Sequence, residues 1–438
     1  MKIHKIDIRN FKGFAERSFN LNEHFTVFIG ENATGKTSVL DALAVALSSF
    51  FLGIEEISSR AIRPNEIHTI IVDGQTRLQK PVIIEACGKI DQIDNLIWRR
   101  EITRTNTTSK DANQLRDIVK QKLIESRKPK GNRDETKITF PVIAYHGTGR
   151  LWASHEKIGF QKQEEGIKMA YTNCLSEKSS PKEFLSWYKT QEDSVKKFEQ
   201  PLDIAHLNAF KRTILDLIPD DRWQDIAFDR RQEELMGIFT DANGQKHKLA
   251  YSQLSDGFRN IIGIAADIAY RCIQLNPHLG EAAVIETPGV VLIDELDVHL
   301  HPNWQRDIVG NFKRIFPNIQ FVATTHSPFI VQSLSKDELI NLDFVEEGEG
   351  LEQDPSNYGI EDVAEIEMGV EDVPRSEAFI ERVEIATKYY QLIAEGKTSK
   401  SDREVAQLRA QLNAMEEQFS DDPAFVATLR LEKNAASL

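Results

Sequence analysis

Residues Gly30 to Thr37 read G-E-N-A-T-G-K-T and match the pattern G-x-x-x-x-G-K-[ST] at every fixed position. Such a loop can hold phosphate, because its glycines let backbone N–H groups converge on phosphate oxygens and the following helix adds a positive dipole end. Lys36 would reach the β and γ phosphates, and Thr37 would offer its hydroxyl to Mg²⁺. The loop therefore predicts a site for a nucleoside triphosphate with Mg²⁺. The expected nucleotide-binding residues are Gly30, Glu31, Asn32, Ala33, Thr34, Gly35, Lys36, Thr37 and Ser38.

A second candidate group follows the apolar run Val290 to Ile293, which has the β-branched composition of a buried parallel strand. Asp294 and Glu295 come directly after it, at the carboxyl end of the strand, where open α/β sheets bind ligands. We expect Asp294 to hold Mg²⁺ through water. Glu295 would then orient and activate the water that attacks the γ phosphate. A purely structural role for two buried carboxylates would be costly.

Two weaker motifs gain meaning from their order in the chain. Leu254 to Gly257 reads L-S-D-G before a helical run, which alone would indicate only a helix cap. Thr324 to Pro328 places His326 directly after another buried strand, where a lone histidine is most often a structural residue. The order is the phosphate loop, the L-S-D-G motif, the acidic strand and then the histidine.

The elements around these motifs predict an α/β fold with an inserted helical lobe. A helix follows Gly35, another begins at Pro302, and the apolar spacing over 180–219 is helical. Residues 226–249 predict a hairpin whose turn is Asp241 to Gly244. Further strands are expected over 2–8, 24–29, 81–86, 95–100, 140–145 and 318–324.

The carboxyl-terminal region predicts a helical hairpin. A first helix carries Phe379, Val383, Ala386 and Tyr390 on one face and stops near Gly396. The second begins at a capping box over 401–404. Its apolar face holds Val405, Leu408, Leu412, Met415 and Phe419.

The composition describes a globular protein. The chain has 438 residues, 40% hydrophobic and 28% charged, with a net charge of -14. This excludes a disordered chain and favours two or three structural units. Ala42 to Ile54, the longest apolar run, is too short to span a membrane and predicts a buried helix, so we expect a cytoplasmic protein. Cys87, Cys174 and Cys272 stand far apart, which argues against a disulfide framework.

Charge is distributed unevenly along the chain. From Asp343 to the end there are 23 acidic and 9 basic residues, which accounts for the whole net charge and suggests a separate unit. Residues 99–137 hold 12 basic and 6 acidic residues. This basic segment could contact DNA phosphates if it folded onto one face, although charge runs are usually solvated surface. The acidic tail would repel DNA and is better suited to docking a protein.

Taken together, the motifs resemble the ABC-type ATPase heads of the SMC, RecF and OLD group over residues 1–345. The resemblance implies that Ser255 and Gly257 bind the γ phosphate held by a second subunit. It also implies that Asp297 communicates across that interface and that His326 contacts the γ phosphate. One head would then hold half of a catalytic site, and ATP would control assembly into a homodimer or a higher homo-oligomer.

Within this group the chain is most similar to the stand-alone ATPases typified by PtuA of the Septu anti-phage defence systems and of related retron modules. The similarity lies in the F-P-V-I-A-Y-H-G-T-G-R-L stretch from Phe140, in D-E-L-D-V-H-L-H-P from Asp294, and in the acidic helical tail after Asn357. It implies a separate HNH-type nuclease as partner, held in check by the ATPase.

The chain also departs from the group. About 100 residues separate Arg150 from Tyr251, too few for the long coiled coil of SMC proteins. No carboxylate-rich Toprim region follows Ser335, so we expect no nuclease centre of its own. Four residues remain open for the glutamine at the start of the helical lobe: Gln161, Gln163, His146 and Arg150. His299 and His301 lack the i, i+4 helical spacing of common zinc motifs, so we expect no metal there.

The sequence therefore predicts four regions. They are an ATPase lobe (1–150), a helical lobe (151–225), a second ATPase lobe (226–345) and an acidic region for oligomerisation or docking (346–438). The function expected is that of a sensor and regulatory ATPase in a defence complex, with no membrane contact. The alternatives are a RecF-like repair ATPase that binds DNA itself and a scaffold that binds ATP with little turnover. A transporter motor is the least favoured.

Overall fold

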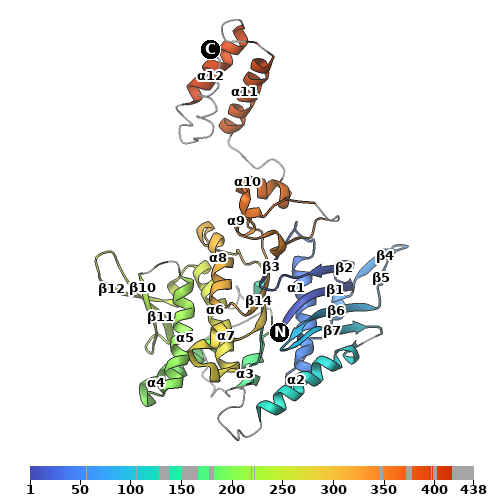
Figure 1. Cartoon of the computed structure of the whole chain (residues 1–438), viewed down its shortest axis with the longest axis vertical. Coiled ribbons are helices and arrows are strands. Elements are labelled where there is room, and N and C mark those ends of the chain that lie inside the picture. The colour runs from blue at the N-terminus through green and yellow to red at the C-terminus, as the bar shows by residue number, and fades with distance from the viewer. Residues whose placement is uncertain are drawn as a thin grey trace. The chain divides into compact units, whose positions relative to one another are not determined.

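The computed structural model describes two compact units, Met1–Gly369 and Val370–Leu438 (Figure 1). The first unit includes residues 349–369, which the sequence had grouped with the acidic region. The described residues are 1–55, 57–104, 106–127, 138–149, 166–176, 182–218, 220, 222–344, 349–370, 377–395, 397 and 402–416.

A parallel sheet forms the centre of the first unit, which we call the head. Its strand order is β15-β3-β14-β13-β9, and all neighbouring pairs are parallel. Every residue of β3, β9, β13 and β14 is buried, so these strands are covered on both faces. The strands are β3 (Phe25–Ile29), β9 (Val142–His146), β13 (Gly289–Ile293), β14 (Ile319–Thr324) and β15 (Leu339–Asn341).

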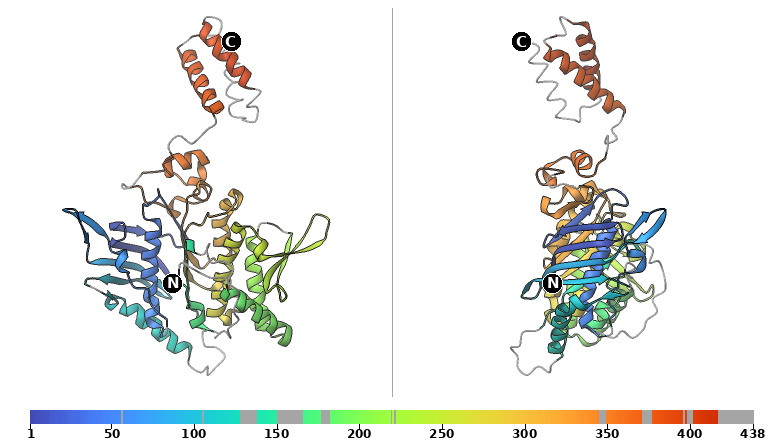
Figure 2. Two further views of the ribbon diagram at one scale, coloured as in Figure 1. Left: turned by 180° about the vertical axis from the view of Figure 1, so that it is seen from behind. Right: turned by 90° about the vertical axis from the view of Figure 1, so that its right-hand side faces the viewer.

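An antiparallel sheet lies on the other side of helix α1 (Lys36–Leu47), which packs between the two sheets (Figures 1 and 2). The indole of Trp98 donates to the Ala46 carbonyl oxygen at 2.9 Å. The stretch Lys36–Gly53 is apolar and long enough for a membrane-spanning helix, but 83% of it is buried inside the fold. The expected buried helix is therefore confirmed. The strands are β1 (Lys2–Phe11), β2 (Phe14–Asn20), β6 (Val82–Ile90), β7 (Ile93–Ile102) and β8 (Thr107–Thr108), in the order β2-β1-β6-β7-β8.

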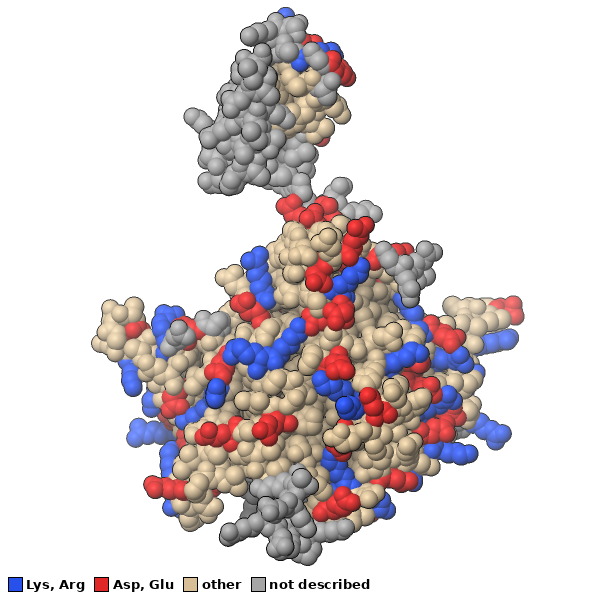
Figure 3. Space-filling view, viewed as in Figure 1, with Lys and Arg blue, Asp and Glu red and all other residues tan. Residues whose placement is uncertain are grey.

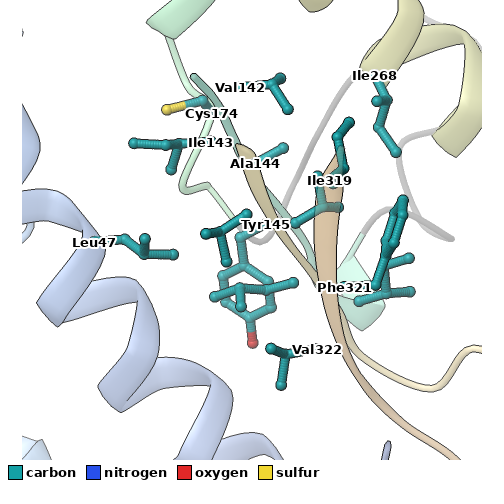
Figure 4. Close-up of a cluster of buried hydrophobic side chains, with 14 of the residues drawn as sticks. Leu47, Val142, Ile143, Ala144, Tyr145, Cys174, Ile268, Ile319, Phe321 and Val322 are labelled. Atoms are coloured by element: carbon teal, nitrogen blue, oxygen red, sulfur yellow. The ribbon is translucent and has the colours of Figure 1, made fainter. Parts of the chain in front are cut away.

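Helices cover the opposite face of the central sheet. Figure 4 shows Leu47 at the end of α1 on one side of β9 and β14, and Ile268 of α6 (Asp256–Leu275) on the other. α5 (Pro201–Leu217) and α8 (Pro302–Ile315) complete this layer. The core is therefore continuous from α1 through the central sheet to α6.

Three helices occupy the described part of the range expected to be a helical lobe, and the predicted hairpin turn is present. The turn closes where the Gly244 N–H donates to the Asp241 carbonyl oxygen at 3.0 Å. The elements are α3 (Ile167–Tyr171), α4 (Lys182–Phe198), α5, β10 (Trp223–Asp229), β11 (Glu234–Thr240) and β12 (Lys246–Ala250). The remaining strands and α-helices described in the head are β4 (Thr69–Val72), β5 (Gln75–Leu78), α2 (Asn113–Ser126), α7 (Ala283–Glu286), α9 (Pro328–Gln332) and α10 (Ile360–Asp362).

The second unit contains the predicted pair of helices, α11 (Glu377–Ala394) and α12 (Arg403–Glu416). Asp402 caps α12, accepting from the Glu404 N–H at 2.8 Å. Ser401 and Phe419 lie outside the described residues, as do the side chains of Phe379, Val383 and Met415. A small core joins the helices through Ala386, Tyr389, Val405, Leu408 and Leu412.

Candidate nucleotide-binding site

The phosphate loop runs from the end of β3 to the start of α1, as its sequence predicts. Gly30, Ala33 and Gly35 have φ angles of 143°, 72° and 107°. A Cβ at Gly35 would lie 2.6 Å from the ring of Phe14, so a side chain does not fit there. At Ala33 a left-handed conformation is held by a residue that has a Cβ, which is a strained backbone position.

Lys36 turns back over the loop. Its Nζ donates to the carbonyl oxygens of Gly30 and Glu31, both at 2.7 Å. Burial lowers the pKa of Lys36, whereas the carboxylates of Asp343, Asp294 and Glu295 act to raise it. The ammonium group therefore lies within the concave side of the loop, where incoming phosphate oxygens could replace the two carbonyl partners.

The hydroxyl of Thr37 meets the carboxylate of Asp294. Thr37 Oγ1 lies 3.0 Å from Asp294 Oδ2 and 3.3 Å from Oδ1. Asp294 is buried at the end of β13, and Thr324 of the neighbouring β14 donates to its Oδ1 at 2.7 Å. A hydroxyl and a carboxylate are the hard oxygen ligands that suit Mg²⁺, which completes its shell with water and substrate phosphate. These two residues fit the predicted role in metal binding.

Glu295 leaves the strand in a left-handed conformation, with φ of 50°. Its N–H donates to Thr324 Oγ1 at 2.8 Å, so one threonine contacts both members of the acidic pair. The Glu295 side chain is partly exposed, whereas Asp294 is 2% exposed. The two carboxylates therefore occupy different environments, as separate roles in metal binding and water activation require.

Asp297 and His326 are joined by hydrogen bonds. Asp297 Oδ1 accepts from Thr325 Oγ1 at 2.6 Å and from the His326 N–H at 3.1 Å. The imidazole of His326 is exposed. The loop after β13 and the loop after β14 are thus fixed to each other beside the acidic pair.

The L-S-D-G motif forms the start of α6. The N–H of Phe258 donates to Ser255 Oγ at 3.5 Å, which makes Ser255 the N-cap, and its side chain is otherwise exposed. Gly257 packs against the backbone of His299. In the part of the chain that the structure describes, the Ser255 hydroxyl makes no hydrogen bond to residues 30–38 of the same head.

Residues 25–332 match the family model described as "AAA domain, putative AbiEii toxin, Type IV TA system". The chain belongs to this family. The match runs from β3 to the end of α9 and so includes the phosphate loop, the L-S-D-G motif, the acidic pair and His326.

Relatives of this AAA-domain chain include ATPases of defence elements. A retron Vc95 probable ATPase of Vibrio cholerae serotype O1 biovar El Tor is 24% identical over 388 residues, which cover 77% of this chain and 73% of the relative. A retron Ec83 probable ATPase of Escherichia coli is 24% identical over 403 residues, covering 77% and 71%. Septu protein PtuA of Bacillus thuringiensis is 35% identical over 157 residues, covering 33% and 38%. The resemblance to this group is confirmed.

Among solved structures, an SMC head bound to the C-terminal winged-helix domain of ScpA shares 15% identity with the AAA-domain chain. The alignment covers 78% of this chain and 94% of the SMC head, with a TM-score of 0.45. The expected class, a P-loop ATPase head with sheets flanked by helices, is confirmed by the parallel sheet and by the loop between β3 and α1.

Of the four residues left open for the glutamine position, His146 is the only one that the structure describes. It ends β9, is 1% exposed and pairs in register with Ile293. Its carbonyl oxygen accepts from the Asp294 N–H at 2.9 Å, and its Nε2 lies 3.6 Å from Asp267 Oδ2. The backbone of His146 therefore holds Asp294 in position at the end of β13. Gln161, Gln163 and Arg150 lie outside the described residues.

Two contacts at the site were missed by the sequence analysis. Thr324 was noted only as part of the histidine motif, although its hydroxyl joins Asp294 to Glu295. Asp343 was counted with the acidic tail, but its carboxylate accepts from the Glu31 N–H at 2.7 Å. β15 pairs with β3 and so brings Asp343 to the start of the loop, a pairing for which the sequence carries no pattern.

The basic segment is partly neutralised within the head. Arg99 pairs with Glu85 at 2.6 Å and Lys122 with Asp91 at 2.6 Å, while Arg100 is 3% exposed. Figure 3 shows acidic and basic side chains interspersed over the face that it presents. Lys128, Lys130, Arg133 and Lys137 lie outside the described residues. In the described part of the segment, Arg99, Arg116 and Lys122 pair with carboxylates and Arg100 is buried, which leaves four exposed cations that could meet DNA.

Proposed function

We propose that this chain binds and hydrolyses Mg²⁺-ATP, dimerises around the nucleotide and acts as the sensor and regulatory subunit of an anti-phage defence complex. The observation that carries the proposal is the meeting of Thr37 and Asp294. These residues come from different motifs, yet their side chains lie 3.0 Å apart at the carboxyl edge of the central sheet. That is the geometry expected of a Mg²⁺ site beside a phosphate loop.

Each residue has a definite role in this proposal. Lys36 would exchange its carbonyl partners for β and γ phosphate oxygens, and Thr37 and Asp294 would hold Mg²⁺. When bound, the metal would neutralise charge on the phosphates. Glu295 would accept a proton from the attacking water, and His326 would contact the γ phosphate, since its imidazole is exposed beside the acidic pair.

Dimerisation would complete the site. Ser255 is exposed at the N-terminus of α6, and within the described residues its hydroxyl makes no hydrogen bond to the phosphate loop of its own head. A helix N-terminus attracts anions, because its N–H groups and dipole favour negative charge. We infer that Ser255, Gly257 and Asp297 act on the nucleotide of a second copy.

Glu295→Gln tests hydrolysis. The amide keeps the shape of the side chain but cannot accept the proton, so ATP binding should persist while turnover falls about 10²- to 10⁴-fold. Glu286→Gln, at an exposed carboxylate on α7, is the matched control and should hydrolyse ATP at the normal rate. Both variants should be measured by phosphate release and by equilibrium nucleotide binding. Unchanged turnover in Glu295→Gln would refute the role of this residue.

A separate HNH-type nuclease is the proposed partner, because the chain resembles the Septu ATPases in both its motifs and its tail. Its docking site would be the carboxyl-terminal unit. The clean deletion begins at Val370 and not at Asn357, because Val363 is fully buried in the head core. Co-expression with neighbouring genes should yield a complex with the full chain only. If residues 1–369 still bound the nuclease, the carboxyl-terminal unit would not be its docking site.

A RecF-like function would require direct DNA binding. The pairing of Arg99 and Lys122 with carboxylates of the head does not favour it. DNA-stimulated hydrolysis by the isolated protein would favour this alternative. A measured turnover near zero with tight ATP binding would favour the scaffold instead.

A further inference from the structure

Asp343 lies directly against the beginning of the phosphate loop. Its Oδ2 accepts from the Glu31 N–H at 2.7 Å, and a Cβ built at Gly30 would lie 3.2 and 3.3 Å from its two oxygens. Strand pairing fixes this position, because β15 runs beside β3 and the Leu342 N–H donates to the Ile29 carbonyl oxygen at 3.0 Å.

The charge of Asp343 opposes that of a nucleotide. Asp343 accepts from the Glu31 N–H, and the carbonyl oxygens of Gly30 and Glu31 hold the Lys36 ammonium group. A triphosphate would bring several negative charges to the same ammonium group and the same loop. The Asp343 carboxylate would then repel the phosphates, and salt would weaken this repulsion because Asp343 is exposed.

A chain of hydrogen bonds continues from Asp343 to the last residues of the head. The Asp343 N–H donates to Asn341 Oδ1 at 3.0 Å, and Asn341 Nδ2 donates to the Glu367 carbonyl oxygen at 2.6 Å. The Glu367 carboxylate accepts from the Leu351 N–H at 2.7 Å and is 6% exposed. Gly369, two residues later, ends the head.

We propose that Asp343 is a positioning residue that lowers the affinity of the phosphate loop for ATP and couples nucleotide binding to the segment 349–369, directly before the carboxyl-terminal unit. Binding of phosphate shifts the loop and the carboxylate that is bonded to it. Asn341 and Glu367 transmit the shift to the end of the head. By linkage, a partner that favours the shifted segment also favours ATP. The inference rests on the proposed binding of ATP.

Asp343→Asn tests the effect of charge. The amide oxygen can still accept from the Glu31 N–H, so only the charge is lost. At low salt, ATP should bind to the variant about 3- to 10-fold more tightly than to the unaltered chain, and the affinity for ADP should rise by a smaller factor. The increase in ATP affinity should shrink at 0.5 M salt. Asp337→Asn is the control. It removes an exposed charge before β15, at the other end of the strand, and keeps an oxygen acceptor for Asn22. The control should bind ATP as the unaltered chain does. If Asp343→Asn also bound ATP with the affinity of the unaltered chain, the proposed effect of charge would be refuted.

Hydrogen exchange tests the coupling. Peptides covering 349–369 should change their exchange rate when ATP binds to the unaltered chain and to Asp343→Asn, which keeps the hydrogen bond to the loop. Asp343→Ala removes that bond, so ATP should bind without changing exchange in this segment. Identical exchange with and without ATP in the unaltered chain would refute the coupling. Failure of the unaltered chain to bind ATP at all would instead refute the proposed function.

Discussion

Gly257 lies so close to His299 that a Cβ on the glycine would come within 2.1 Å of the histidine carbonyl oxygen. This contact sets the start of α6 against the loop that follows the acidic pair. The motif that is expected to act on a second subunit and the loop expected to communicate with that subunit are therefore packed together within one head. A substitution that moves the L-S-D-G motif away from this loop should therefore disturb the position of the motif and of the loop.

Gly257→Ala should therefore impair hydrolysis more than ATP binding. The clashing atom belongs to the backbone, so the helix start or the loop must shift, and thermal unfolding should show a loss of about 1–3 kcal/mol. Gly263→Ala is the control in the same helix. Its Cβ would lie 3.1 Å from the Tyr251 hydroxyl, and the better helix propensity of alanine offsets this tight contact. Normal turnover in Gly257→Ala would contradict the prediction.

Thr324→Val should slow hydrolysis while leaving the fold intact. The substitution keeps the shape but removes the hydroxyl that donates to Asp294 and accepts from the Glu295 N–H. Loss of hydrogen bonds to such buried groups costs about 1–3 kcal/mol, measured by denaturant unfolding. Thr324→Ser, which retains a hydroxyl, should recover both stability and rate. Equal rates for the valine and serine variants would show that the hydroxyl has no role.

Mixing two inactive variants tests completion of the site by a second subunit. Lys36→Ala should disable the loop, and Ser255→Arg should disable the exposed helix start. A mixed dimer would contain one intact site, made from the loop of one subunit and the Ser255 of the other. Random exchange between two-fold dimers should restore about a quarter of the original rate. A mixture no more active than its components would indicate that each head works alone.

The buried thiols should resist modification. Burial raises the pKa of Cys174 and of Cys272 from 9.0 to about 12 in each case. Because both thiols hold their protons more tightly in the folded chain, they stabilise it fully below pH 9, and this contribution is lost as the pH rises towards 12. Iodoacetamide at pH 8 should therefore modify the partly exposed Cys87 first. Equal labelling of all three in the native protein, read by mass spectrometry, would contradict their burial.

Local motifs made much of the site predictable. Lys36 and Thr37 belong to one contiguous loop, and Asp294 follows a strand whose apolar residues indicate that it is buried. The phosphate-binding loop and the carboxylate at the strand end could therefore be predicted without knowledge of long-range contacts. The pairing of β15 with β3 left no comparable pattern, and Asp343 was therefore missed. The role of Thr324 was missed for the same reason, because only the tertiary fold shows which groups its hydroxyl meets.

The predicted boundary between the ATPase lobe and the acidic region, at residue 345, was based on the change in charge. Charge reflects composition and does not show which residues pack in the core. Leu351 and Val363 lie in the core of the head although acidic residues surround them in the sequence. Asp402, the second residue of the predicted capping box, provides an oxygen that caps α12, whereas Ser401 lies outside the described residues. Short polar residues compete for such positions, so local sequence alone defines them only approximately.

Because the head core closes before Val370, the carboxyl-terminal unit is a separable module in evolutionary terms. Recombination after Gly369 could join a different helical unit to the same ATPase without exposing the residues that stabilise it. If this unit docks a partner as proposed, such an exchange would change the partner while the nucleotide site stays constant. Chimeras joined at this residue should therefore tolerate exchange better than chimeras joined within 346–369.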